Sequence, residues 1–102
     1  MKRRSISRRY LRNRWYFLSQ DRSGNLLIDG ISVRELERKF GTPLFIMVEK
    51  EIRNRVRRFK KAFPYPKLRV QYAGKINTNL EILKVVREEG MELDASSVGE
   101  II

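Results

Sequence analysis

One lysine offers the clearest chemistry in this sequence. Lys75 lies just beyond residues 68–73, which we expect to form a strand, and two positions before Asn77, whose amide offers a donor and an acceptor. Burial of an ammonium group removes its hydration, lowers the lysine pKa and makes the amine a better nucleophile. A lysine that forms a Schiff base needs this property. The alternative is that Lys75 ends the strand and reaches solvent, as most lysines do.

Polar residues also follow the next expected strand, residues 91–95. Asp94, Ser96 and Ser97 lie at its carboxyl end. Neighbouring parallel strands are about 5 Å apart, so these groups can face the same pocket as Lys75. A carboxylate near a lysine can set its charge, and hydroxyls can bind an oxygen of a substrate or cofactor.

The composition excludes several other kinds of chemistry. The chain of 102 residues contains no cysteine and no histidine. It therefore has no disulfide, no thiolate metal site and no nucleophile paired with histidine, and we expect no metal site. Any chemistry must use lysine, carboxylates or a cofactor.

Two expected strands and the helix between them position these residues. Residues 68–73 and 91–95 predict strands, while Thr78 and Glu81 have capping-box spacing and Gly90 is a helix stop. The expected buried face of the helix contains Leu80, Ile82, Leu83, Val85 and Val86. This order predicts a β-α-β unit with parallel strands.

Residues 49–63 predict an amphipathic helix, because apolar residues recur at spacings of four, three and four. The apolar residues are Ile52, Val56, Phe59 and Phe63, and the opposite face carries Arg53, Arg57, Lys60 and Lys61. We expect this basic face to be solvated. The alternative is contact with phosphate backbones.

The residues before this helix predict a hairpin. An aromatic strand at residues 15–18 is followed by turn chemistry at 21–25 and a returning strand at 26–28. Asp29-Gly30 closes the hairpin.

A short helix and a strand are expected next. Ser32 and Glu35 again have capping-box spacing, and Gly41 is a suitable helix stop. Residues 44–48 form a continuous apolar run, which predicts a strand buried on both faces.

The net charge of +11 is concentrated at one end. Residues 1–14 contribute +7 of it, with no acidic residue. We expect a solvated, disordered tail, and contact with nucleic acid is the alternative. The expected organisation is a tail at 1–14, a lead-in at 15–48 and the start of a larger domain at 49–102. No apolar segment approaches membrane-spanning length, so we expect a cytoplasmic protein.

The last residues indicate a helix that does not continue. Ser97 and Glu100 are a third capping-box pair, so a helix should begin at Val98, yet the sequence stops at Ile102. One helical turn is not stable alone, and two parallel strands leave both sheet edges open. We therefore expect the front part of a longer α/β protein, with the missing part C-terminal.

Three motifs together resemble a known family. They are Tyr72-Ala73-x-Lys75-x-Asn77, then Leu93-Asp94-Ala95-Ser96-Ser97-Val98-Gly99-Glu100, and upstream Phe40-Gly41-Thr42-Pro43-Leu44-Phe45. Their order and spacing resemble the fold-type III pyridoxal-phosphate decarboxylases, the ornithine/diaminopimelate/arginine decarboxylase group. The upstream motif is similar to that of the diaminopimelate branch. The resemblance spans roughly residues 26–102.

The resemblance implies a fold and a function. The fold is an incomplete (β/α)8 TIM-type barrel, preceded by a hairpin of the family's β-domain. Lys75 would bind pyridoxal 5'-phosphate as a Schiff base, with Asp94, Asn77 and Ser97 near the cofactor, while Glu100 is expected to cap the helix. The complete protein would be a homodimer that converts meso-diaminopimelate to L-lysine and CO₂.

The sequence also departs from the family pattern. Ile76 stands where the family usually has a small residue, so we expect crowding beside the cofactor. The family's histidine, glycine-rich loop and second-subunit residues are missing, so we expect the chain alone to be inactive. The alternatives are an ornithine, arginine or carboxynorspermidine decarboxylase, a small basic nucleic-acid-binding protein, or a truncated, non-catalytic remnant of the enzyme.

Overall fold

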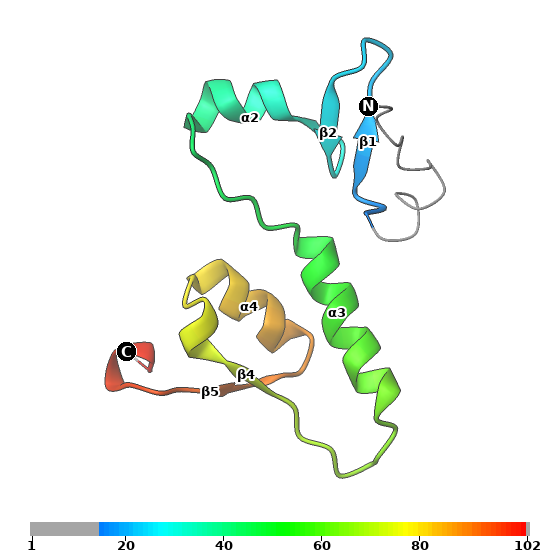
Figure 1. The fold of residues 1–102 in the computed structure, drawn as a ribbon. Coiled ribbons are helices and arrows are strands. Elements are labelled where there is room, and N and C mark those ends of the chain that lie inside the picture. Colours follow the sequence, from blue (N-terminus) through cyan, green and yellow to red (C-terminus); the bar gives the residue numbers. More distant parts are fainter. Residues whose placement is uncertain (1–14, 102) are drawn as a thin grey trace, which may run out of the picture. The chain divides into compact units, whose positions relative to one another are not determined.

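The computed structural model describes residues 15–101, which form a mixed α/β structure (Figure 1). The chain divides into two compact units, of which the first ends at Val48 and the second begins at Glu49. Each unit has its own sheet. The expected basic tail, residues 1–14, lies outside the described residues.

The first unit contains an antiparallel sheet in the order β1-β2-β3. Its strands are β1 (Leu18–Gln20), β2 (Leu26–Ile28) and β3 (Ile31–Ser32). In the first turn the Asp21 carboxylate accepts hydrogen bonds from the Asn25 side chain and from backbone N–H groups, and these bonds lower the Asp21 pKa. The expected hairpin is therefore confirmed.

A second turn follows β2 instead of ending the hairpin. Asp29 and Gly30 have φ values of 48° and 84°, the left-handed pair that a two-residue turn between antiparallel strands requires. The chain therefore returns once more as β3.

The expected strand at residues 15–18 is wrong, because only Leu18 belongs to a strand. Leu18 N–H donates to the Trp15 carbonyl at 2.8 Å, which closes a turn. The rings of Trp15 and Tyr16 both pack edge-on against Phe17, with centroids 5.7 Å apart in each pair. Residues 15–17 thus form contacts between neighbouring aromatic rings, and their side chains do not alternate between two faces as they would in a strand.

Helix α2 (Val33–Phe40) begins where expected and ends at Gly41, whose φ is 75°. Ser32 is its N-cap residue, but its side chain makes no cap hydrogen bond. The expected buried strand at residues 44–48 is wrong, since no strand forms there and Phe45 is 96% exposed. A strand needs a partner for its backbone groups, and within residues 15–101 no strand pairs with this run.

The second unit confirms the parallel β-α-β prediction. It contains α3 (Glu49–Ala62), β4 (Gln71–Ala73), η1 (Gly74–Ile76), α4 (Leu80–Glu88), β5 (Glu92–Asp94) and η2 (Val98–Glu100). Strands β4 and β5 pair in parallel, with Ala73 opposite Asp94. Helix α3 packs against α4 (Figure 1), and the strands are shorter than expected.

Helix α4 differs from its prediction at its start and in its buried face. The Asn79 side chain, not that of Thr78, accepts the capping bond from Glu81 N–H at 3.0 Å. The buried residues are Ile82, Val85 and Val86, while Leu80 is 73% exposed. They form a core with Val56 of α3 and Val70 beside β4. Helix α4 has apolar residues on more than one face. The packing of α3 and the sheet against it therefore decides which of these side chains are buried.

The basic face of α3 is partly solvated, as expected, since Lys61 is exposed and the Arg57 side chain is 63% exposed, but it also forms contacts that we did not expect. Arg57 binds the Glu89 carboxylate through two hydrogen bonds of 2.7 Å, and Arg53 binds both Glu88 and Glu89. Lys60 donates to the Glu89 carbonyl at 2.7 Å, at the end of α4. Three of its four expected basic residues therefore hold α4 against α3.

Candidate functional site

Lys75 lies in the turn that directly follows β4. This turn is η1, and it closes where Asn77 N–H donates to the Gly74 carbonyl at 3.1 Å. The Lys75 side chain is exposed. The structure thus favours the interpretation in which the lysine ends a strand and reaches solvent, leaving its amine open to a ligand.

Gly74 brings η1, the turn that carries Lys75 and is called the lysine turn below, close to β5. A Cβ atom on Gly74 would lie 3.0 Å from Cδ1 of Leu93 and 3.4 Å from the Asp94 carbonyl oxygen. Glycine is needed here for close approach, since its φ is not in the left-handed region. The absence of a side chain allows η1 to pack directly on β5.

Asp94 shares the carboxyl edge of the sheet with the lysine turn. It is the last residue of β5 and lies opposite Ala73, two residues before Lys75. Both side chains are exposed. Within residues 15–101 no hydrogen bond or ion pair joins them, so the structure brings their strand ends together without forming a direct contact.

Ser97 and Glu100 lie in the segment that follows β5. The Glu100 carboxylate accepts from the backbone N–H groups of Ser96 and Ser97, the latter at 3.3 Å. This confirms Glu100 as a cap, although the helix it starts is the single 3₁₀ turn η2. The sequence did not reveal that a Glu100 oxygen lies only 3.7 Å from a Cβ built on Gly74.

Asn77 links the lysine turn to α4. Its side-chain oxygen accepts from Asn79 N–H at 3.0 Å, and its backbone carbonyl accepts from the Tyr72 hydroxyl at 3.0 Å. The side-chain amide of Asn77 therefore binds a backbone N–H group at the start of α4. The neighbouring Ile76 is 76% exposed, and so presents an apolar surface beside Lys75.

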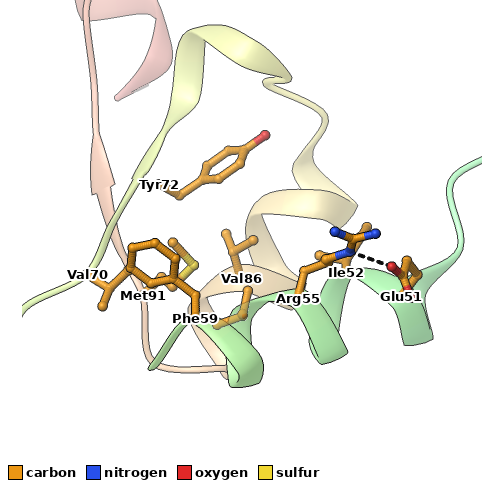
Figure 2. A pocket seen from close by; sticks show the side chains of 9 residues that line it. Glu51, Ile52, Arg55, Phe59, Val70, Tyr72, Val86 and Met91 are labelled. Carbon is orange, nitrogen blue, oxygen red and sulfur yellow. Dashed lines mark hydrogen bonds and ion pairs between the residues drawn. The ribbon is translucent and has the colours of Figure 1, made fainter. Parts of the chain in front are cut away.

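An apolar pocket of about 350 Å³ lies between α3 and β4 (Figure 2). Its lining residues are Glu51, Ile52, Arg55, Val56, Phe59, Val70, Tyr72, Val86 and Met91. Figure 2 shows the Tyr72 ring over this pocket, with its hydroxyl directed away from Val70 and Met91. Neither Lys75 nor Asp94 lines the pocket, so it is separate from the strand ends.

The described residues offer neither a metal site nor a membrane-spanning helix. No group of three His, Cys, Asp or Glu residues between positions 15 and 101 could hold a metal ion. Over the same range, every helix is too short or too polar to cross a membrane.

Comparison with known proteins gives consistent matches. Residues 49–102 match the family model described as the pyridoxal binding domain of pyridoxal-dependent decarboxylases. A diaminopimelate decarboxylase of Methanothermobacter thermautotrophicus is 45% identical over 80 residues, which cover 76% of this chain and 19% of that protein. A diaminopimelate decarboxylase of Staphylococcus aureus is 37% identical over 83 residues, covering 79% and 20% respectively.

A solved structure is similar as well. The crystal structure of AQ1208 from Aquifex aeolicus matches with a TM-score of 0.75 and 37% sequence identity. The match covers 84% of this chain and 21% of that one. The chain therefore spans about a fifth of the length of the relatives it matches.

Proposed function

Because this chain belongs to the family of pyridoxal-dependent decarboxylases, we propose that it supplies the cofactor-binding lysine, Lys75, of a diaminopimelate decarboxylase. The observation that carries the proposal is the position of Lys75 directly beyond β4, at the carboxyl edge of the parallel pair β4–β5. In parallel α/β folds, reactive groups gather at the carboxyl ends of the strands. The relatives named diaminopimelate decarboxylase support this branch over the ornithine, arginine and carboxynorspermidine enzymes.

The proposed fold is the beginning of a (β/α)8 barrel. Strand β4, helix α4 and strand β5 would be its first β-α-β unit, since they form a parallel pair with a helix between. The antiparallel strands β1 to β3 would belong to the family's β-domain. Two parallel strands with open edges call for further strands, which supports a larger sheet.

The residues at the strand ends fit the aldehyde end of pyridoxal phosphate. Lys75 offers an exposed primary amine on a backbone that Gly74 packs against β5. When bound, the cofactor supplies an electron sink for the carbanion left by loss of CO₂. Lys75 would hold the cofactor covalently, with the Asp94 carboxylate at the neighbouring strand end. The hydroxyl of Ser97 would donate to a cofactor oxygen, and Asn77 would fix the turn.

The rest of the proposed site would come from other residues. This chain contains no histidine and spans about a fifth of its relatives. We therefore expect these 102 residues alone to show no decarboxylase turnover. The amino-acid substrate, the homodimer and the cytoplasmic location of the complete protein remain proposals that the family resemblance suggests.

Reductive trapping tests the proposed role of Lys75. We would incubate the chain with pyridoxal phosphate, reduce it with borohydride and map the modified lysines by mass spectrometry. Label should concentrate on Lys75, and Lys75→Ala should remove it. Lys84→Ala is the matched control, because Lys84 is an exposed lysine of the same unit that pairs with Glu81 at 2.7 Å. Equal labelling of all lysines would refute the proposal.

A further inference from the structure

We infer that Tyr72 is a positioning residue whose hydroxyl holds the turn that presents Lys75. The inference rests on the proposed function of Lys75 and deepens it. Tyr72 occupies the middle of β4, three residues before the lysine. Its hydroxyl donates to the Asn77 carbonyl at 3.0 Å, in a partly buried position. This bond spans η1, so Lys75 lies inside a loop that is closed at both ends.

The far end of the loop is tied to helix α4. The Asn77 side chain accepts from Asn79 N–H, and the Asn79 side chain accepts from Glu81 N–H, both at 3.0 Å. Asn77 is therefore bound from two sides. Its backbone carbonyl accepts from Tyr72 of β4, and its side chain accepts from Asn79, the N-cap residue of α4. Loss of the Tyr72 hydroxyl would leave the strand side of the loop to the backbone hydrogen bonds of η1, which include the bond from Asn77 N–H to the Gly74 carbonyl.

The position of the loop matters because the lysine side chain itself is not held. Lys75 has an exposed, flexible side chain, so the protein controls its amine through the backbone. A small misplacement of a reacting group has a large effect on its rate. The hydroxyl of Tyr72 would thus influence how often the Lys75 amine reaches a ligand beside Asp94.

The tyrosine ring has a separate role, which makes the hydroxyl testable by itself. The ring lines the apolar pocket beside Val70 and Met91 (Figure 2). Tyr72→Phe keeps this ring and removes only the hydrogen bond to Asn77. Tyr65→Phe is the matched control, because Tyr65 is 64% exposed in the loop between α3 and β4.

The experiment compares two readouts in the full chain. After incubation with pyridoxal phosphate and brief borohydride reduction, Tyr72→Phe should lower the ratio of Lys75 label to Lys84 label about fivefold, the factor that one ordinary hydrogen bond supplies. Amide hydrogen exchange at Asn77, measured by NMR without cofactor, should become faster by a similar factor. Tyr65→Phe should change neither quantity.

The outcomes separate this inference from the proposed function. If the unmodified chain labels Lys75 no more than Lys84, the proposed function fails, while exchange at Asn77 still reports on the turn. If Lys75 is labelled selectively and Tyr72→Phe leaves the ratio unchanged, the positioning role is overturned. Unchanged Asn77 exchange, or global unfolding of Tyr72→Phe by circular dichroism, would also overturn it.

Discussion

Glycine at position 74 is the residue on which the geometry of the candidate site most directly depends. The space that a side chain would need is taken by Leu93 and by the backbone of Asp94. A methyl group at this position would require the Leu93 side chain to move aside. The site therefore depends on a residue without functional groups as well as on Lys75.

Gly74→Ala should destabilise the second unit by about 1 kcal/mol, because extra atoms in a tight contact force neighbouring groups to shift. The cost stays small since the nearest atom, Leu93 Cδ1, is at the end of a side chain that can move. Urea unfolding followed by circular dichroism measures the change. Gly99→Ala is the control, because its nearest atom would be Ser97 Oγ at 4.0 Å. Equal stability of the two variants would contradict the steric argument.

At the scale of elements, a polar cluster joins the two helices of the second unit. Glu89 lies just beyond α4 with a side chain only 9% exposed, and Arg57 and Arg53 of α3 bind it. The hydrogen bonds from Arg57, with a smaller contribution from Arg53, lower the Glu89 pKa to about 2. This cluster lies at the end of α4, and β5 begins four residues after the last residue of that helix.

Stability should depend on pH through Glu89. Its folded-state pKa is depressed, so its contribution is complete above the unfolded pKa of about 4.5 and is lost as pH falls toward 2. In urea unfolding between pH 6 and pH 2, Glu89→Gln should lower the midpoint at pH 6 and flatten its dependence on pH. Glu81→Gln, which removes an exposed pair with Lys84, should have less effect. Parallel pH profiles for Glu89→Gln and the unmodified chain would rule out this role.

The elements themselves were largely predictable, while their contacts were not. Helix α3 and the β4-α4-β5 unit follow from local periodicity and from glycine and proline stops. Which face of α4 is buried depends on α3, so Leu80 was wrongly placed in the core. The Arg57–Glu89 pair spans 32 positions, and no local pattern indicates it.

The candidate site was predictable as a set of strand ends but not as a set of contacts. Parallel pairing places the end of β4, which leads to Lys75, beside Asp94, as the β-α-β pattern indicates. The hydrogen bond from Tyr72 to Asn77 and the closeness of Glu100 to Gly74 arise from the fold and were missed. The strand expected at residues 44–48 failed because a buried strand needs partners as well as apolar residues.

For the whole molecule, the distribution of charge indicates where any nucleic-acid binding would occur. Two groups of cations were candidates for phosphate contact: residues 1–14, and the basic face of α3. Arg53, Arg57 and Lys60 of that face are engaged with the end of α4. The cations of residues 1–14 are then the main source of any attraction to nucleic acid.

Deletion of residues 1–14 should therefore remove most of any nucleic-acid binding. The segment carries +7 of the net charge of +11, and each phosphate contact adds about 0.9 to the slope of log K against log salt for B-DNA. Fluorescence anisotropy with duplex DNA at several salt concentrations should show a slope that falls by up to about 6 on deletion. Lys84→Ala, on α4, should leave it nearly unchanged. A steep slope retained after deletion would show that the second unit binds phosphates, and would favour the nucleic-acid interpretation, because a decarboxylase fragment needs no such surface.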